Sequence, residues 1–399
     1  MNHFYKVIKD IFVSIFKMAE ENKLSFDELS LKDNLLRGIY SYGFENPSII
    51  QHKAIPIFTK GRDLIAQAQS GTGKTGAFVI GSLHKVNTEE KSTQIIIISP
   101  TRELSRQTMS VLEELSKYMD VTYQEVIGGT DVFACRAGLD KSPHIVVGTP
   151  GRILDMINKK SLFTDKIATV VFDEADEILS YGFKETIYEI VQRIPEETQI
   201  CLFSATMPNE VLELTEKFMN NPESILVKKE ALTLEGIKQF YINMKVSDWK
   251  YDILKDLYDT ISISQCIIYF NSKNKLMEIN DRLIEENFPV SFIHGDLSSE
   301  ERKQTMDLFK GGQSRILLST DLLSRGIDIQ QLSLVINFDL PRSKETYIHR
   351  IGRSGRYGRK GVAINFITDR DSTQMAELEE HYNTKVEEMP ADISEYLGV

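Results

Sequence analysis

Short apolar runs alternate with stretches of helical periodicity along most of this chain. Each run ends in small, polar or charged residues, and between the runs apolar side chains recur every three or four positions, as from Met109 to Met119. Buried strands separated by helices predict parallel β-sheets that are covered by helices on both faces. The runs that we interpret as strands are 63–68, 94–99, 144–149, 169–174, 199–206, 265–270, 290–295, 315–321, 332–338 and 361–368.

The alternation is interrupted once, by the polar stretch at 228–236. A chain of 399 residues is also too long for one ordinary hydrophobic core. We therefore predict an α/β fold with two domains, at 23–228 and 237–399, joined by a short linker at 229–236. The apolar, slightly basic segment at 1–22 precedes them as an extension to which we assign no role.

Composition limits the class of protein. No window reaches the roughly 18 uninterrupted apolar residues of a membrane span, so we expect no membrane association. The net charge of −11 argues against a general nucleic-acid binder, but the charge is segregated: seven Lys or Arg stand against one acid at 341–361, and eight acids against one Lys from Asp371 onward. Three separated cysteines, Cys135, Cys201 and Cys266, predict buried thiols in a reducing compartment.

A glycine-rich segment follows the first predicted strand and precedes a helix. It nearly matches the phosphate-binding pattern G-x-x-x-x-G-K-[ST], with Ala68 where glycine is usual; a small residue fits there if its φ is negative. Such a loop turns backbone N–H groups toward a phosphate, and Lys74 would reach the outer phosphates while Thr75 would ligate Mg²⁺. We expect a nucleotide to bind at Ala68, Gln69, Ser70, Gly71, Thr72, Gly73, Lys74 and Thr75.

Two acidic residues end the strand predicted at 169–174. Asp173 is placed to hold Mg²⁺, as the second acidic partner of a phosphate-binding loop does. Glu174 is placed to orient and deprotonate a water that attacks the γ-phosphate. An acidic turn at the start of a helix is the alternative, and the upstream loop argues against it.

The stretch "HRIGRSGR" carries Arg350, Arg353 and Arg356, three positions apart among glycines. Side chains at this spacing project from one region. They could stabilise the charge of a transferring phosphoryl group, or form a basic loop that only contacts nucleic-acid phosphates.

Seven motifs, in order, resemble the series of the DEAD-box ATP-dependent RNA helicase family. They are "AQSGTGKT", "PTREL", "TPGR", "DEAD", "SAT", "STDLLSRGID" and "HRIGRSGR", and the resemblance runs from about residue 23 to the end. It implies two tandem RecA-like domains that close on ATP and RNA together. "LTLEGIKQF", "QQLSLVIN" and "EEMP" are most similar to members that act in translation initiation.

The resemblance also implies roles for individual residues. Gln51 would read the adenine edge, Phe44 or Phe26 would stack on the base, and Asp328 would contact the ribose. Arg353 and Arg356 would be paired arginine fingers. Couplers between hydrolysis and domain movement would be Ser204 and Thr206, and RNA contacts would be Thr101, Arg102, Gly128, Gly129, Thr149, Arg152 and Thr320.

Some positions depart from the family pattern. Ser105 and Ser324 replace alanines, which we expect to be harmless, whereas Lys273 and Asn274 stand where relatives commonly carry arginines, which weakens the case for an RNA contact there. His294 and His349 could be mistaken for metal ligands. Because no second ligand cluster accompanies them, we expect structural or coupling hydrogen bonds instead.

These observations predict an ATP-dependent RNA helicase with local, non-processive unwinding, probing RNA through its phosphates and 2′-OH groups without sequence preference. We expect ATP and Mg²⁺ as cofactors, a monomer, a cytoplasmic place with a nuclear one left open, and scaffold or stimulatory proteins of the translation machinery as partners. The main alternative is an ATP-dependent RNA clamp within a ribonucleoprotein complex, and a third is a metabolic kinase.

Overall fold

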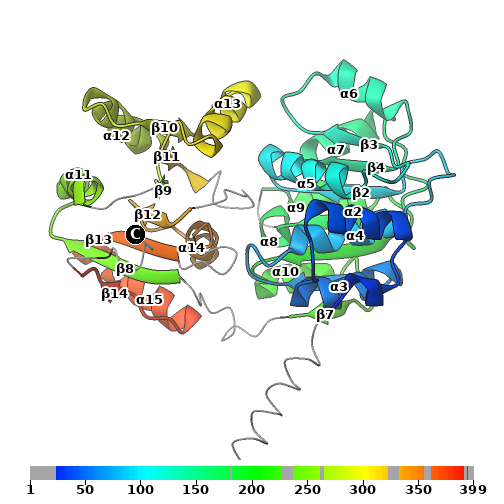
Figure 1. The fold of residues 1–399 in the computed structure, drawn as a ribbon, viewed down its shortest axis with the longest axis horizontal. Helices are drawn as coiled ribbons and strands as arrows, with labels where there is room; N and C mark the ends of the chain where they lie inside the picture. The colour runs from blue at the N-terminus through cyan, green and yellow to red at the C-terminus, as the bar shows by residue number, and fades with distance from the viewer. Residues whose placement is uncertain are drawn as a thin grey trace, which may run out of the picture.

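The computed structural model describes residues 24–179, 182–226, 237–260, 265–321, 332–354, 361–390 and 393. Figure 1 shows two α/β domains side by side, with helix α14 of the second domain on the side that faces the first. The predicted extension at 1–22 and the predicted linker at 229–236 lie outside the described residues.

The first domain is built on a parallel sheet with the strand order β3-β4-β2-β5-β6-β1-β7. Its strands are β1 (Leu64–Gln67), β2 (Ile95–Ile98), β3 (Tyr123–Val126), β4 (Ile145–Gly148), β5 (Thr169–Asp173), β6 (Gln199–Ser204) and β7 (Glu223–Ile225). Its helices are η1 (Phe26–Leu29), α2 (Asp33–Tyr42), α3 (Ile49–Thr59), α4 (Lys74–Lys85), α5 (Arg102–Leu115), α6 (Val132–Leu139), α7 (Pro150–Asn158), α8 (Ala175–Ile178), α9 (Lys184–Val191) and α10 (Asn209–Thr215).

Strand β2 shows why the apolar runs are continuous. Ile95 and Ile97 belong to the core that the sheet forms with α2 to α5, while Ile96 and Ile98 belong to the core on the other face, which includes α6 to α10. Successive side chains of a strand point to opposite faces. A strand with helices on both faces must therefore be apolar at every position.

The second domain has the strand order β10-β11-β9-β12-β13-β8-β14, which is the order of the first domain repeated. All of its pairings are parallel as well. Its strands are β8 (Ile237–Met244), β9 (Cys266–Tyr269), β10 (Val290–Ile293), β11 (Ile316–Ser319), β12 (Leu334–Asn337), β13 (Gly361–Thr368) and β14 (Glu387–Glu388). Its helices are η3 (Ser247–Trp249), α11 (Lys250–Thr260), α12 (Lys273–Glu285), α13 (Ser299–Lys310), α14 (Lys344–Ile351), η5 (Asp369–Asp371) and α15 (Ser372–Tyr382).

The predicted α/β fold with parallel sheets is confirmed, and each predicted strand overlaps an observed one. Strands β3, β7, β8 and β14 were not predicted. The helix predicted through Met119 was drawn too long, because α5 ends at Leu115 and Met119 lies in a turn whose N–H donates to Ser116 O at 2.7 Å. None of the helices in the described ranges combines the length and hydropathy that a membrane span requires.

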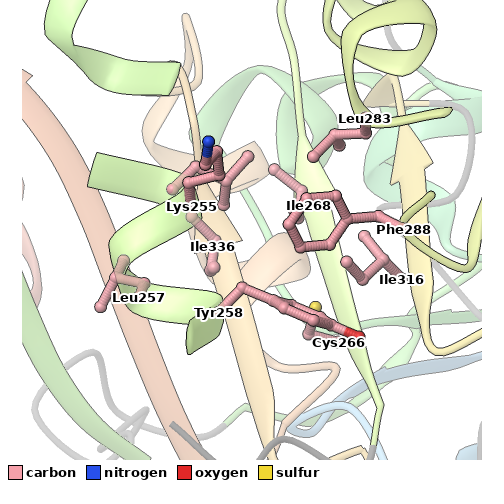
Figure 2. Close-up of a pocket in the computed structure, with 10 residues that line it drawn as sticks. Lys255, Leu257, Tyr258, Cys266, Ile268, Leu283, Phe288, Ile316 and Ile336 are labelled. Carbon is pink, nitrogen blue, oxygen red and sulfur yellow. The ribbon is translucent and has the colours of Figure 1, made fainter. Parts of the chain in front are cut away.

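A small apolar cavity lies in the second domain between α11, α12 and the sheet (Figure 2). Its volume is about 10 Å³, and Tyr258, Cys266, Ile268 and Phe288 are among its lining residues. A space of this size has no room for a nucleotide, and an apolar lining keeps it dry. Cys266, like Cys135 and Cys201, is buried and not in a disulfide, as predicted.

Shortening Ile268 should enlarge this cavity and destabilise the second domain. Ile268 is fully buried at the centre of β9, so Ile268→Ala removes packing that the rigid sheet cannot replace. We expect a loss of about 4 kcal/mol in the free energy of unfolding, measurable by urea denaturation. An unchanged midpoint would show that the cavity can collapse.

Candidate active site

The order of strands in the first sheet divides its carboxyl edge into two halves. The glycine-rich loop follows β1, Asp173 ends β5 and Ser204 ends β6, and these three strands are consecutive in the sheet. Most of the expected RNA contacts follow β2, β3 and β4, which form the other half. Ligands of parallel sheets bind at this edge. One edge thus presents a phosphate half beside an RNA half.

The glycine-rich loop has the backbone that phosphate binding requires. Gly71 and Gly73 have φ values of 79° and 98°, where glycine is favoured, and α4 begins at Lys74. Ala68 is not among the residues with positive φ, as the sequence required, and its N–H donates to Ser204 O at 3.0 Å. The substitution of glycine by Ala68 therefore leaves the shape of the loop intact.

Lys74 lies folded into this loop. Its Nζ donates to Ala68 O at 2.8 Å and to Gln69 O at 3.2 Å, and its side chain is buried. Burial lowers the pKa of Lys74, and the charges of Glu174 and Asp173 oppose that shift. The ammonium group is thus close to both acidic residues.

Asp173 and Glu174 are buried at the end of β5. Glu174 has a φ of 50°, a left-handed conformation that costs energy in a residue other than glycine, and its N–H donates to Asp173 Oδ1 at 3.0 Å. Burial, followed by the charge of Glu174, raises the pKa of Asp173. Backbone strain of this kind clusters at functional sites, which supports a chemical role for Glu174.

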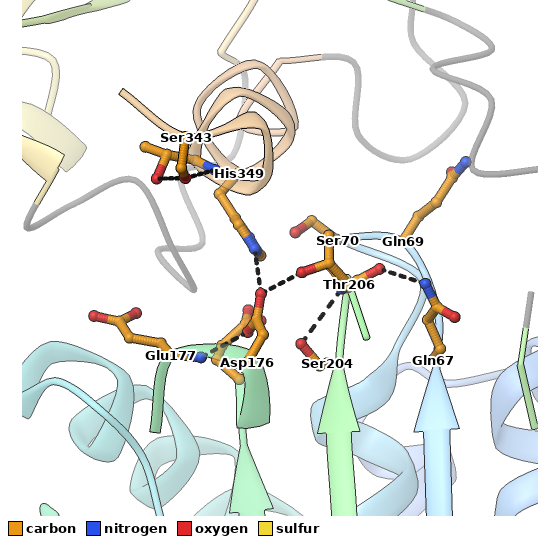
Figure 3. A network of polar contacts seen from close by, with 12 residues as sticks. Gln67, Gln69, Ser70, Asp176, Glu177, Ser204, Thr206, Ser343 and His349 are labelled. Atoms are coloured by element: carbon orange, nitrogen blue, oxygen red, sulfur yellow. Dashed lines mark hydrogen bonds and ion pairs between the residues drawn. The ribbon is translucent and has the colours of Figure 1, made fainter. Parts of the chain in front are cut away.

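Asp176, the last residue of "DEAD", joins the two domains. Its Oδ2 accepts a hydrogen bond from Thr206 Oγ1 at 2.5 Å and another from His349 Nε2 at 2.9 Å. Figure 3 shows His349 reaching from α14 of the second domain to Asp176 of the first. The sequence assigned Asp176 no role. Thr206, which was expected to couple hydrolysis to movement, is therefore bonded to the residue that holds α14.

His349 lies in a cluster that the sequence did not anticipate. Ligand atoms of Glu174, Asp176 and His349 all lie within 4.8 Å of one another. The expectation that no ligand cluster accompanies His349 was therefore wrong. The hydrogen bond of its Nε2 to Asp176 accounts for its position without a metal ion.

Arg353 makes a second contact between the domains. Its Nη2 donates to Ser70 Oγ of the glycine-rich loop at 3.3 Å, and its Nε donates to His349 O at 3.1 Å. The side chain is almost fully buried. Arg356 and Asp328, which were expected to act beside it, lie outside the described residues.

Arg350 does not share this direction. It is buried inside the second domain, where its guanidinium donates to Asp321, Asn337, Asp339 and Asn271. The prediction that the three arginines project from one region was wrong, since α14 ends at Ile351 and Arg353 belongs to the following turn.

The expected adenine site lies against α4. Gln51 Nε2 donates to Gly73 O at 3.2 Å. A Cβ atom on Gly76 would lie 2.6 Å from that nitrogen and 3.1 Å from Cε2 of Phe44, so only glycine permits this packing. Phe26 is fully buried and stacks on Phe44 with 6.2 Å between ring centroids. Of the two aromatic candidates, half-buried Phe44 is the one that a base can reach.

The expected RNA contacts of the first domain form a connected surface. A Cβ on Gly129, whose φ is 80°, would lie 2.4 Å from Arg102 Nη1, so the guanidinium lies directly over the glycine. Gly128 N–H donates to Thr149 Oγ1 at 3.3 Å, and Arg152 donates to Thr130 O at 3.1 Å. Thr101 caps α5. These residues are half-buried or exposed and remain accessible to a polyanion.

A third contact joins the domains beside this surface. Arg302 of α13 donates to Glu103 Oε1 of α5 at 3.3 Å, and both side chains are largely buried. Burial, followed by the charge of Arg302, lowers the pKa of Arg102, which shows that positive charge converges here. Thr320, the expected contact of the second domain, follows β11. The sequence did not single out Arg302 or Glu103.

Family models match both domains. The model described as "DEAD/DEAH box helicase" matches residues 48–214, and "Helicase conserved C-terminal domain" matches residues 249–358. The "ATP-dependent RNA helicase eIF4A" of Candida albicans is 57% identical over 372 residues, covering 92% of this chain and 93% of the relative. The chain belongs to the DEAD-box helicase family. The "Eukaryotic initiation factor 4A" of Caenorhabditis elegans is 51% identical, covering 94% of this chain and 93% of that relative.

A solved DEAD-box structure has the same arrangement of domains. The structure titled "S. cerevisiae Dbp5 bound to RNA and ADP BeF3" is 36% identical and covers 94% of this chain and 99% of its own, with a TM-score of 0.88. The similarity spans both domains at once. The two tandem RecA-like domains of this DEAD-box helicase are therefore placed as in that bound protein.

Departures from the DEAD-box pattern have local explanations. Ser105 is buried, but its Oγ donates to Thr101 O at 3.1 Å, so the hydroxyl is satisfied within α5. Lys273, at the start of α12, forms an ion pair with Asp296. A lysine already paired with a carboxylate has less charge to offer a phosphate. Ser324 lies outside the described residues.

Proposed function

We propose that this chain is an ATP-dependent RNA helicase of translation initiation, which closes its two domains on ATP and RNA together. The observation that carries the proposal is the pair of contacts from α14 and its following turn to the first domain, His349 to Asp176 and Arg353 to Ser70. Groups of the second domain thereby complete a site that the first domain begins.

The residues divide the ATPase chemistry between them. Lys74 leaves the loop carbonyls to bind the outer phosphates, and Glu174 takes a proton from the attacking water. Arg353, with Arg356, stabilises the charge that develops on the transferred phosphoryl group. Gln51 and Phe44 recognise the adenine, and Asp328 the ribose.

Thr75 and Asp173 are the residues that would hold Mg²⁺. A hydroxyl and a carboxylate are the oxygen donors that this hard cation prefers. The fit is supported by the raised pKa of Asp173, since a buried carboxyl beside Glu174 gains from a nearby cation. When bound, Mg²⁺ neutralises phosphate charge.

RNA lies, in this proposal, along the half of the edge that carries Arg102, Gly129 and Arg152, and continues to Thr320. Arginines and backbone N–H groups bind phosphates without reading bases. Contacts of this kind, with 2′-OH groups, give a preference for RNA without sequence specificity.

The energy of closure fits local unwinding. Moving a two-state equilibrium from 1:99 to 99:1 needs about 5.5 kcal/mol of differential binding. One stacked base-pair step is worth about 1.4 kcal/mol, with the DNA value as a stand-in. Closure can therefore separate a few base pairs but not a long duplex. The clamp alternative is not favoured, because the high-identity relatives are named RNA helicases.

The cellular setting follows from the same relatives. Their names as initiation factors support a role on messenger RNA in the cytoplasm, with scaffold or stimulatory proteins of the translation machinery as partners. We propose that the chain acts there as a monomer.

The test is ATP hydrolysis measured with and without single-stranded RNA, alongside strand separation of a short and a long duplex. We expect RNA to raise kcat at least about tenfold, and only the short duplex to separate. The Lys74→Ala variant is the control for contaminating ATPases. Hydrolysis that is indifferent to RNA would favour a metabolic kinase instead, and a long-lived RNA complex without strand separation would favour the clamp.

A further inference from the structure

Arg350 is a fully buried arginine whose role the ATPase chemistry does not explain. It is the largest of the fully buried side chains in the described residues. A buried charge is costly unless it is paired and hydrogen-bonded. Its Nε donates to Asp321 Oδ1 at 2.7 Å, Nη1 to Asp339 O at 2.7 Å and to Asn337 Oδ1 at 3.2 Å, and Nη2 to Asn271 Oδ1 at 2.7 Å.

These acceptors come from three neighbouring strands. Asp321 follows β11, Asn271 follows β9, and Asn337 and Asp339 end or follow β12. In the sheet these strands lie in the order β11-β9-β12. A single guanidinium therefore reaches across the carboxyl edge of the second sheet.

The two ends of this span lead to different ligands. On one side, Arg350 belongs to α14, whose His349 and following Arg353 bond to the first domain at the ATP site. On the other side, Asp321 comes directly after Thr320, the proposed RNA contact. Asp321 alone among the four acceptors is a carboxylate side chain, and it is 49% exposed.

We infer that Arg350 is a positioning residue that links RNA binding at Thr320 to the placement of α14 through its bond with Asp321. Asn271 and Asn337 hold the guanidinium to the sheet, so movement of Asp321 shifts the balance of forces on α14. RNA that favours one position of Asp321 thereby favours the position of α14 that completes the ATP site. The inference rests on the proposed RNA-stimulated ATPase.

A merely structural arginine predicts a different result. If Arg350 only holds the domain together, loss of the Asp321 bond lowers ATPase activity with and without RNA in proportion. If it links the two sites, the loss falls on the RNA-stimulated rate. The ratio of the two rates therefore separates the alternatives.

The experiment uses the full chain with the Asp321→Asn variant, which keeps the shape of the side chain and removes its charge. We expect the kcat without RNA to stay within about twofold of wild type and the kcat at saturating single-stranded RNA to fall about tenfold, the value of one charge-assisted hydrogen bond. The Arg350→Lys variant should behave alike. The double variant should be no worse than the worse single variant, because both remove the same contact.

Two controls keep the test falsifiable. Tyr347→Phe removes a hydrogen bond from the same helix to Gln239, and Ile268→Ala destabilises the same domain; both should keep the wild-type ratio. Normal stimulation in Asp321→Asn, equal losses with and without RNA, or multiplying effects in the double variant would each overturn the link. A wild-type protein that RNA does not stimulate would overturn the proposed function itself, and the link with it.

Discussion

Replacing Glu174 with glutamine should stop ATP turnover while ATP binding is retained. Glutamine has the same shape but cannot accept the proton of the attacking water, and removal of a general base costs about 100- to 10,000-fold in rate. Glu174 is buried beside Lys74 and Asp173 and held by a left-handed backbone, so glutamine should occupy the same position. Single-turnover hydrolysis and equilibrium nucleotide binding would measure the two effects separately.

Glu177→Gln is the matched control for this variant. Glu177 lies on the same short helix α8, and Figure 3 shows its side chain directed away from the contact between Asp176 and His349. We expect near-normal turnover. If Glu174→Gln hydrolysed ATP at the wild-type rate, the base would be another group, and Asp176 would be the next candidate.

The fold was largely predictable because both sheets are buried on both faces. Runs such as "IIIISP" after Gln94 are apolar without interruption, and a strand in the middle of a two-sided sheet has no other solution. The strands that escaped prediction lie at or near sheet edges. Strand β3 reads Tyr-Gln-Glu-Val and is only half-buried over most of its length, so its pattern resembles that of a surface loop.

The repeated strand order was hidden for a related reason. The two domains share one topology, yet no fixed-period repeat is visible in the sequence. Many apolar sequences satisfy the same pattern of burial. Topology can therefore persist where the residues that encode it differ.

Motifs predicted the parts of the site that are local in sequence, and no pattern predicted which distant parts meet. The glycine-rich loop and "DEAD" each follow a strand, so their position at the carboxyl edge followed from the sheet alone. Asp176 and His349 are 173 positions apart, and Glu103 and Arg302 are 199 apart. Which of the many charged residues pair across an interface depends on how two domains dock, and spacing carries no signal for that.

Arg350 and Arg353 illustrate this limit within one motif. They are three positions apart and chemically identical, but Arg350 faces the interior of its own domain and Arg353 faces Ser70 of the other. The difference arises because α14 ends at Ile351, and the backbone then turns. A helix end that is misplaced by one turn reverses the assignment of role.

Truncation of Arg353 should reduce kcat far more than ATP affinity. Its guanidinium reaches the glycine-rich loop from the second domain, where negative charge develops during phosphoryl transfer, and such arginines are worth about 1,000-fold in kcat. Ground-state phosphates are already held by Lys74 and the N–H groups of the loop. We therefore expect Arg353→Ala to lose about 1,000-fold in RNA-stimulated kcat, while the Kd for ATP changes by less than about threefold.

Two further substitutions decide what the loss means. Arg353→Lys keeps the charge but not the planar fork, so it should recover only part of the rate. Arg315→Ala makes the same truncation at an exposed position directly before β11, at the opposite edge of the sheet, and should leave the rate unchanged. Equal losses in kcat and in ATP affinity for Arg353→Ala would mean that this arginine binds ATP in the ground state. Domain closure would then have to act on the reaction through His349 and Asp176 alone, because those two side chains form the other contact between the domains at the phosphate half of the edge.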